Sequence, residues 1–594
     1  MLTGSEFSPA EEGVRGAVAA GALADLREGN QRADDPRGGQ MWGPGRTVRA
    51  DVLAHLLTEV VAAERPRSVR LAGARIAGML DLEVARLACP VLLSGCWFEE
   101  PVNLAEASVP ALRLPGCHLP GLRAAQLTVD GNLELNDGFT AGGEVNLLGA
   151  YISGHLICSG ATLASRERPA LNGSRITVGQ SMICNARFTA FGEVRLRGAH
   201  ILGDLDFSGA NLVNPDGRAL SAGRLAVDQD LICGPGFTAR GEILLIGAHV
   251  GGDLDMGGAA LANANGPAVY ANRLSVGQSM FCRAGFSASG EVRLLGASVG
   301  GRLSFATASL ANPGGIALQA ERLTVAQDIF FTEGMTAAGE IRLPGARVGG
   351  NADFTGCKPP GSGPGFILIL TELQAASLIL RPQAAPEEAD LTGAAVGRLA
   401  DEPASWPSQL RLRGFTYAAL DEKEKVSAGE RLGWLTRDRD GYSPQPYEQL
   451  AAVYRREGRE QDAREVAIAR QRARRRTLAL PGRLWSLLLD VAIGYGYRTW
   501  LAGVWLLGWW AAGTLVFAAA YPHHLIPAAP NAPHPAFQPV IYALDVLLPV
   551  VDLNQQEFWI PQGLARWFAW ASILAGWLLA TAIVAAVTGA VKRD

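Results

Sequence analysis

The feature that most constrains this chain is an internal repeat with a period of 49 residues, most regular over residues 139–350. Five segments open alike, with Phe or Met followed by Thr or Ser. They begin at Phe139, Phe188, Phe237, Phe286 and Met335. No insertion disturbs the spacing, so each unit must be one piece of a stacked, solenoid-type architecture.

Each unit divides into two similar parts of 26 and 23 residues. Residues 194–207 and 220–233 share one pattern, in which apolar residues alternate with other types. Alternation is typical of strands, and the Gly, Asn, Asp and Pro residues between them predict turns. The sequence therefore predicts a mainly β fold, a parallel β-helix with two coils per unit. Equivalent residues of successive units then lie roughly 9.6 Å apart.

Charged residues follow the same period. One column contains Glu144, Glu193, Glu242, Glu291 and Glu340, and a second contains Arg175, Arg224, Arg273 and Arg322. If the two columns face each other across a corner, they form structural ion pairs, which is the favoured interpretation. If they lie apart, each column is a charged stripe that can meet a protein partner.

Three cysteines also form a column, Cys184, Cys233 and Cys282, and Phe331 takes its next position. Two coils of separation exceed the roughly 7 Å between Cα atoms that a disulfide allows, and they exclude a shared zinc ion with bonds of about 2.3 Å. These cysteines are expected to be small buried side chains.

Composition and charge limit the possible partners of this chain of 594 residues. Its hydrophobic content is 48% and its formal net charge is −4. The charge argues against a nucleic-acid partner. Patterning along the chain predicts an N-terminal helical cap at residues 1–66, the β-helix at 67–418, a helical connector at 419–482 and a membrane domain at 483–594.

The N-terminal segment is acidic and lacks the apolar run of a signal peptide. Ser8, Pro9 and Glu11 form a capping-box pattern, which predicts a helix that continues to about Arg27. A second helix is expected at residues 50–63, and the two helices would cover the open edge of the solenoid.

The connector is expected to hold a helical hairpin, which resembles a single tetratricopeptide-type pair. Its second helix ends in five arginines just before the apolar C-terminal region: Arg470, Arg472, Arg474, Arg475 and Arg476. This position predicts contact with anionic lipid headgroups, and a solvated helix face is the alternative.

Two uncharged stretches, residues 500–521 and 567–591, are long enough to cross the ~30 Å of hydrocarbon in a bilayer. Arg and Lys are absent from residues 501–565, abundant before them, and present again at Lys592 and Arg593. The positive-inside rule therefore predicts a two-span protein of the inner (plasma) membrane with both termini in the cytoplasm.

Between the spans, residues 537–552 are apolar but too short to cross, which is typical of an interfacial or re-entrant segment. Asp545 and Asp552 within it are expected to face a partner or water. The order of the segments resembles the pore module of two-span ion channels, although the potassium filter sequence is missing. A structural hairpin anchor is favoured over a pore, which would require a homo-oligomer.

No catalytic residue, cofactor or metal site is predicted. The sequence contains no P-loop, no H-E-x-x-H and no G-x-S-x-G motif. His200 and His249 share a column that other residue types fill elsewhere, which indicates a variable corner. Asp204 with Asp206, and Asp253 with Asp255, recur in two units only and are interpreted as solvated surface residues.

The coil motifs, the segment S-P-Q-P-Y-E-Q-L at residues 443–450 and the two spans together resemble an uncharacterised bacterial family of actinobacterial type. Its members are often labelled "membrane-associated oxidoreductase". The resemblance covers nearly the whole chain and implies a membrane-anchored β-solenoid. The sequence gives the oxidoreductase part of the label no support, because it contains no nucleotide-binding fingerprint, no redox Cys pair and no haem or iron–sulfur spacing. Residues 206–212 are also similar in texture to pentapeptide-repeat proteins, although the 49-residue period departs from theirs.

The sequence thus favours a cytoplasmic β-solenoid that a C-terminal hairpin anchors to the inner membrane, where it acts as a scaffold or binding platform rather than an enzyme. An oligomeric, sensor-gated pore and a membrane-associated oxidoreductase are the alternatives.

Overall fold

The computed structural model describes residues 7–61, 67–165, 167–361, 365–421, 426–498, 500–529, 535–548 and 550–591. The chain divides into two units. The first comprises Met1–Val426 with Arg437–Arg439, and the second comprises Ser427–Thr436 with Asp440–Asp594. We call them the solenoid unit and the C-terminal unit and describe each by itself.

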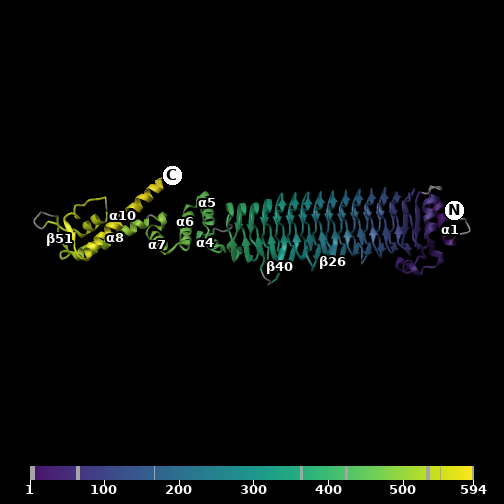
Figure 1. Ribbon diagram of the computed structural model, residues 1–594, viewed down its shortest axis with the longest axis horizontal. Coiled ribbons are helices and arrows are strands. Elements are labelled where there is room, and N and C mark those ends of the chain that lie inside the picture. Colours follow the sequence, from purple (N-terminus) through teal and green to yellow (C-terminus); the bar gives the residue numbers. More distant parts are fainter. Residues whose placement is uncertain are drawn as a thin grey trace. The chain divides into compact units, whose positions relative to one another are not determined.

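The solenoid unit is a stack of about 15 turns, and each regular turn contains four short strands (Figure 1). One such turn holds β20 (Thr177–Val178), β21 (Met182–Ile183), β22 (Thr189–Phe191) and β23 (Val194–Arg195). Strands of successive turns pair in parallel and form one 27-stranded and one 23-stranded sheet. The predicted parallel β-helix is confirmed.

The 49-residue period corresponds to two turns. Thr177 pairs with His200 in the next turn, and His200 pairs with Ala226 in the one after. The first step is 23 residues long and the second is 26.

The longer turn of each pair carries an additional loop. In β26 (Asn211–Ser221) the pairing with the next turn shifts register after Val213, where the loop leaves the strand. Asn214 closes it by donating from Nδ2 to the Arg218 carbonyl oxygen at 2.8 Å. Asn263 and Asn312 close the equivalent loops of the next two units in the same way.

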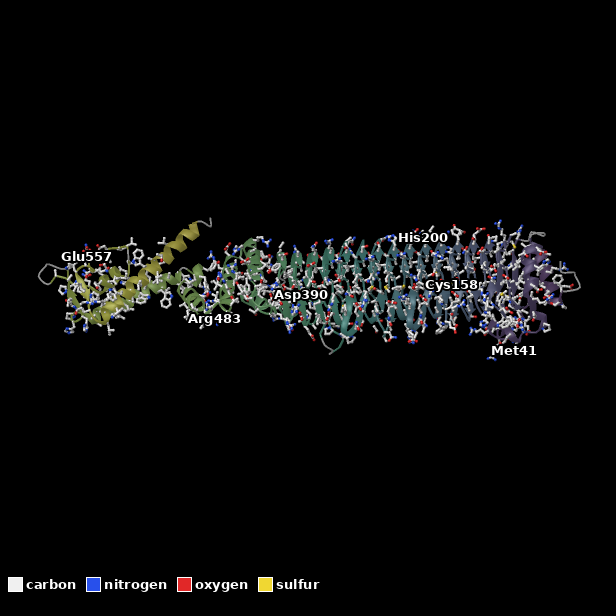
Figure 2. The ribbon with its side chains drawn as sticks, viewed as in Figure 1. Met41, Cys158, His200, Asp390, Arg483 and Glu557 are labelled. Atoms are coloured by element: carbon white, nitrogen blue, oxygen red, sulfur yellow. The ribbon has the colours of Figure 1, made fainter. Side chains whose placement is uncertain are left out.

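The solenoid core consists of columns of apolar side chains, because residues that alternate along a strand point alternately inward and outward. Phe305, Phe331 and Phe354 form one such column, with ring centroids 5.4 and 4.7 Å apart. Coils stacked at about 4.8 Å place equivalent rings directly on one another. Figure 2 shows Cys158 inside the stack and His200 pointing away from it.

The N-terminal cap contributes strands as well as helices. Helix α1 (Pro9–Ala20) begins with the predicted capping box at Ser8 and Glu11. It ends seven residues before Arg27, because Gly21 adopts a left-handed conformation with φ 64°. The chain then forms β1 (Leu23–Asp25), which pairs with β3 (Val69–Ala72), so the expected helix end was wrong.

A second segment completes the cap. Strand β2 (Thr47–Arg49) pairs with β4 (Arg75–Ala77), and α2 (Ala50–His55) continues into a π-helical turn, η3 (Leu56–Val60). The strands β1 and β2 therefore cover the exposed edges of the first full turn by pairing with them.

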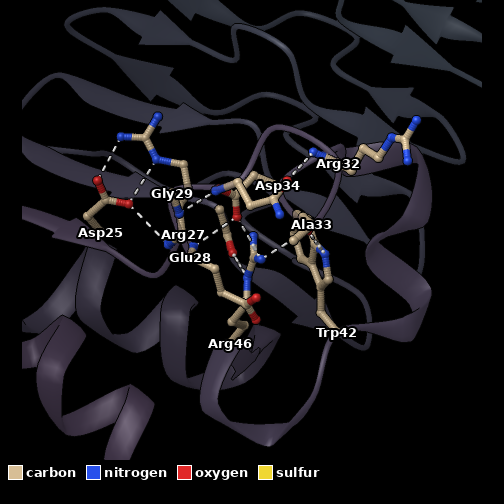
Figure 3. A network of polar contacts seen from close by, with 11 residues as sticks. Asp25, Arg27, Glu28, Gly29, Arg32, Ala33, Asp34, Trp42 and Arg46 are labelled. Atoms are coloured by element: carbon tan, nitrogen blue, oxygen red, sulfur yellow. Dashed lines mark hydrogen bonds and ion pairs between the residues drawn. The ribbon is translucent and has the colours of Figure 1, made fainter.

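The loop between β1 and β2 is held by a network centred on Arg46 (Figure 3). Arg46 donates from Nε to the Gly73 carbonyl oxygen at 2.9 Å and forms an ion pair with Asp34 at 2.9 Å, while its guanidinium lies 3.7 Å from the centroid of Trp42. Asp34 also accepts the backbone amide of Gly29. The buried arginine thus fixes a connection whose only helices are two short 3-10 helices, η1 (Pro36–Met41) and η2 (Pro44–Arg46).

The C-terminal unit is helical. Its helices are α4 (Ala428–Leu435), α5 (Pro444–Arg456), α6 (Glu460–Arg475), α7 (Leu480–Ile493), α8 (Trp500–Ala520), α9 (Pro539–Leu547) and α10 (Leu564–Val591). A short antiparallel pair, β51 (Leu525–Pro527) and β52 (Trp559–Pro561), lies between α8 and α10 in the sequence. The expected hairpin is α5 and α6, separated by Gly458 with φ 73°. Helices α4 and α7 are absent from the helices that the sequence predicts.

Candidate functional site

Two helices of the C-terminal unit are long and apolar enough to cross a membrane. They are Trp500–Ala520, with a mean hydropathy of 1.6, and Leu564–Thr581, with a mean hydropathy of 1.2. Large apolar side chains on both helices are exposed, among them Leu507, Leu515, Leu574 and Leu578. An apolar surface of this extent is unusual for a protein in water and is what the lipid of a bilayer would cover.

Helix α9 packs tightly against both of these helices. A methyl group added to Gly576 on α10 would lie 1.8 Å from the Leu547 carbonyl oxygen, and one added to Gly513 on α8 would lie 3.2 Å from Ala543 Cβ. Trp510 donates from Nε1 to the Val540 carbonyl oxygen at 3.1 Å. The predicted short segment is therefore a helix, α9. Gly513 and Gly576 have no side chain, so α8 and α10 can approach α9 closely.

Asp545 on α9 is 4% exposed and accepts three backbone amides. The donors are Leu553 at 2.7 Å, Gln555 at 3.0 Å and Gln556 at 2.7 Å. These bonds offset the cost of burying a carboxylate and fix the chain that follows α9.

Asp552 accepts the backbone amide of Asn554 at 2.9 Å and is exposed. An open groove of about 560 Å³ brings Asp552 together with Asp545 and Glu557, beside Ile573 and Trp577 of α10. The structure thus places the two predicted aspartates at one groove, one as a structural acceptor and one toward solvent.

The five predicted lipid-contacting arginines divide into two groups. Arg470 forms an ion pair with Glu448 at 2.5 Å, and Arg472 and Arg475 both bind Asp490 of α7, at 3.0 and 2.5 Å. Arg474 and Arg476 are exposed, and neither forms an ion pair within the described part of the chain. Three of the five side chains therefore already have acidic partners inside the protein.

The glutamate column of the solenoid is neutralised, but not by the predicted arginines. Glu193 pairs with Arg195 at 2.5 Å and Glu291 with Arg293 at 2.8 Å. The remaining pairs are Glu144 with Arg168, Glu242 with Arg218, and Glu340 with Arg342. The expected pairing between the two columns was wrong, because the glutamates and the column of Arg175, Arg224, Arg273 and Arg322 lie at different corners of the coil.

The arginine column occupies a corner where each residue adopts a left-handed backbone. The φ values of Arg175, Arg224, Arg273 and Arg322 lie between 53° and 56°. Gly198, Gly247 and Gly296 hold the same position in the intervening turns, with φ values of 61° to 62°. A methyl group on Gly198 would lie 3.8 Å from Arg175 Cγ and one on Gly296 would lie 4.0 Å from Arg273 Cγ, whereas no atom lies within 4 Å of one on Gly247. All four arginines are exposed, and none forms an ion pair among the described residues.

Aspartates at another corner bind the backbone of the next turn. Asp204 Oδ1 accepts the amide of Asp230 at 3.1 Å, Asp230 Oδ1 accepts that of Asp253 at 2.7 Å, and Asp253 Oδ1 accepts that of Ser279 at 2.7 Å. The interpretation of Asp204 and Asp253 as solvated surface residues was therefore wrong. Glycine recurs every 49 residues beside this corner, and a methyl group on Gly252 would lie 2.1 Å from Asp230 Oδ1, so a larger residue does not fit there.

All eight cysteines are buried and unbonded. Because Met182–Ile183 pairs with Leu156–Ile157, Cys184 lies one turn from Cys158, a neighbour that the 49-residue column concealed. Burial raises the pKa of Cys184 well above its usual value and raises that of Cys233 to about 12. These thiols stay protonated near neutral pH and are poor nucleophiles.

Comparisons with protein-family models, curated proteins and solved structures return no match. Within the described ranges, no group of three or more His, Cys, Asp and Glu side chains has an arrangement that could hold a metal ion. Lys592 and Arg593, which the predicted orientation uses, lie outside those ranges. The site with the clearest physical signature is therefore the exposed apolar surface of the C-terminal unit.

Proposed function

We propose that this chain is a membrane-anchored scaffold, in which α8 and α10 cross the bilayer and the β-solenoid presents a rigid surface to protein partners in the cytoplasm. The observation that carries the proposal is the exposed apolar surface of two helices with span length. The absence of Arg and Lys from residues 501–565 supports an orientation with both termini on the cytoplasmic side of the inner membrane.

The scaffold role is supported by a difference between the acidic and basic side chains on the outside of the solenoid. Asp230 accepts a backbone amide of the next turn and so joins two turns, and Glu193 is paired with Arg195 within its own turn. The arginine column is different, because its four guanidinium groups have no acidic partner in the described chain. We propose this column as the surface for an acidic protein partner, which charge complementarity favours.

Extraction of membranes that contain the full-length protein tests the anchor. A protein with two spans remains in the membrane pellet after alkaline carbonate and after high salt, because lipid covers its apolar helices. Release by either treatment would show that it is peripheral. Protease added to sealed, right-side-out vesicles should leave the solenoid intact if it faces the cytoplasm, and cleavage of the solenoid would overturn the orientation.

A homo-oligomeric cation pore is the second candidate, because one groove gathers Asp545, Asp552 and Glu557 beside α10. Two spans cannot enclose a channel alone, so this function needs several copies. Light scattering of the detergent-solubilised protein, corrected for detergent, gives the number of chains. A monomer would remove the pore, and a tetramer or pentamer with cation flux that Asp552→Asn abolishes would favour it.

A further inference from the structure

Helix α7 (Leu480–Ile493) carries apolar side chains on a face that the described part of the chain leaves uncovered. Leu480, Leu484, Leu487 and Val491 are 73%, 70%, 51% and 53% exposed. Their spacing of four, three and four residues places them on one stripe of the helix. Four large exposed aliphatic residues in one stripe are unfavourable in water and indicate a surface that is covered in the working protein.

A different face of α7 is polar and is fixed to α6. Asp490 forms ion pairs with Arg472 and Arg475, and Ser486 Oγ accepts a hydrogen bond from Arg475 Nε at 3.2 Å. Burial alone would raise the pKa of Asp490, but the hydrogen bonds from the two arginines outweigh it and hold the pKa below its ordinary value. The ion pairs therefore set the rotation of α7 about its axis, so the apolar stripe stays turned outward.

Arginines that have no acidic partner in the described part of the chain lie at the end of α6 and on α7. Arg474 and Arg476 at the end of α6 are exposed, and so is Arg483 on α7, which Figure 2 labels. Arg483 donates from Nε to the Leu478 carbonyl oxygen at 2.7 Å and from Nη2 to the Arg476 carbonyl oxygen at 3.1 Å. These bonds to neutral acceptors position the guanidinium without removing its charge.

The stripe lies beside a proposed span. Trp505 of α8 donates from Nε1 to the Val491 carbonyl oxygen at 3.1 Å, so the C-terminal end of α7 packs on the first turns of α8. Trp500 and Val504 of those turns are themselves exposed. The uncovered apolar surface of α7 is therefore close to that of the helix that enters the bilayer.

We propose that α7 is an in-plane helix that lies in the cytoplasmic interface of the bilayer, with its apolar stripe against the acyl chains and Arg474, Arg476 and Arg483 on the phosphates of anionic phospholipids. This inference rests on the proposed anchor and adds a specific lipid class to it. An apolar stripe next to basic residues is the arrangement by which amphipathic helices bind anionic interfaces. Lipid is favoured over a protein partner because the stripe adjoins the exposed apolar side chains of the first turns of α8, which the bilayer would cover.

Fluorescence depth measurement on the full-length protein tests the proposal. Leu484→Cys and, as the reference in the span, Leu574→Cys are labelled with a nitrobenzoxadiazole dye, since all eight native cysteines are buried. The labelled proteins are reconstituted into phosphatidylcholine vesicles with about 30% phosphatidylglycerol. We expect nitroxide near the lipid headgroup to quench the dye at position 484 most strongly, and nitroxide deeper in the acyl chain to quench the dye at position 574.

The outcomes separate the two proposals. A water-exposed dye at position 484 with a lipid-quenched dye at position 574 overturns the role of α7 and leaves the anchor intact. If lipid nitroxide quenches the dye at neither position, both the role of α7 and the membrane anchor are overturned. A dye at position 484 that is shielded from a water-soluble quencher but insensitive to lipid nitroxide shows that protein covers the stripe, which also overturns the proposal.

The contribution of the arginines to lipid selection is tested with a pair of variants, one of which is a matched control on the same helical hairpin. The variant Arg474→Gln/Arg476→Gln should lower the enrichment of phosphatidylglycerol around the purified protein on the order of 10-fold, measured by mass spectrometry of retained lipids. Arg455→Gln/Arg464→Gln removes the same charge from exposed positions away from α7 and should change little. Equal effects of the two variants would show that lipid selection follows net charge alone and would overturn the specific site.

Discussion

The solenoid unit and the C-terminal unit satisfy the same physical requirements with opposite distributions of side chains. In the solenoid, Phe331 and its neighbours fill the inside, and Asp230 binds backbone amides on the outside. In the C-terminal unit, Leu515 and Leu574 face outward, and Asp545 is buried with three amide donors. A carboxylate binds backbone amides in both units, so the difference lies in the solvent that each surface is built to meet.

The two units also differ in how they tolerate close contact. Solenoid turns approach one another through backbone pairing that repeats at every turn, whereas the C-terminal unit depends on single contacts such as that at Gly576. A repeat distributes its stability over many equivalent interfaces. We therefore expect one substitution in the C-terminal unit to have a larger structural effect than most substitutions in the solenoid.

The largest effect is expected for Gly576→Ala. The added methyl group would lie 1.8 Å from the Leu547 carbonyl oxygen, so α9 must move away from α10 at a cost of at least about 3 kcal/mol. Gly508→Ala on α8 is the control, because no atom lies within 4 Å of the new group. Thermal unfolding in detergent micelles compares the two, and equal midpoints would refute the tight contact.

Loss of a stacked ring should come next. Phe331→Ala removes a fully buried ring between Phe305 and Phe354, and we expect a loss of about 3–5 kcal/mol in the free energy of unfolding. Phe191→Ala, at a ring that is 48% exposed, should change it by less than about 0.5 kcal/mol. Denaturant titration of each variant provides the measurement.

The cap should respond to pH through Glu11, which is buried. Burial opposes its ionisation, but hydrogen bonds from the Arg49 side chain and from the amides of Ser8 and Arg49 lower its pKa to about 2. Because the pKa is lower in the folded state, the stabilisation of about 3 kcal/mol is complete above pH 4.5 and is lost as the pH falls toward 2.

Comparison of the wild-type protein with Glu11→Gln measures this contribution, since glutamine keeps the shape of the side chain but not its charge. The difference in free energy of unfolding should shrink as the pH falls from 4.5 toward 2. A difference that stays constant over this range would mean that the charge of Glu11 does not stabilise the cap.

Asp545→Asn should cost about 2 kcal/mol, because the neutral amide is a weaker acceptor and turns a donor toward backbone amides. Asp552→Asn, at an exposed residue with one amide donor, should cost less than about 0.5 kcal/mol. The same thermal measurement in micelles compares them. If both variants are equally stable, Asp545 does not hold the segment after α9.

The smallest effect is expected at the arginine column. Arg224→Gly should leave stability unchanged or raise it by up to about 1 kcal/mol, because glycine adopts the left-handed corner without strain. Arg240→Gly, in the middle of β29 (Thr238–Leu244), should lower stability by about 0.5–1 kcal/mol. A strongly destabilising Arg224→Gly would show that the arginine stem contributes more to packing than its strain costs.

Periodicity accounts for the parts of the fold that the sequence predicted well. The 49-residue spacing and the alternation of apolar residues depend on neighbours in the chain and in the next turn, so they predicted two coils per unit and the inward columns. Likewise, the capping box at Ser8 was predicted correctly because it is local. Helix α7 was missed, because its apolar stripe is short and merges in the sequence with the first predicted span.

The candidate site residues were harder to predict. The sequence shows that Glu193 and Arg175 recur with one period, but the position of each column around the coil follows from corner geometry, which places Glu193 beside Arg195 instead. For the same reason, the spacing within the Cys184 column concealed Cys158 in the adjacent turn. A signal was present, since both cysteines end an x-Leu-Ile-Cys or x-Met-Ile-Cys pattern.

The sequence by itself determined the stack of coils, the two apolar helices and the short segment between them, because a regular pattern of apolar residues predicts each of them. Tertiary structure decided which charges are neutralised and which stay available. Arg472 and Arg475 are bound by Asp490, whereas Arg474 and Arg476 between and beyond them remain exposed. Successive residues of a helix point in different directions, so only the packing of a second helix determines which of them find a partner.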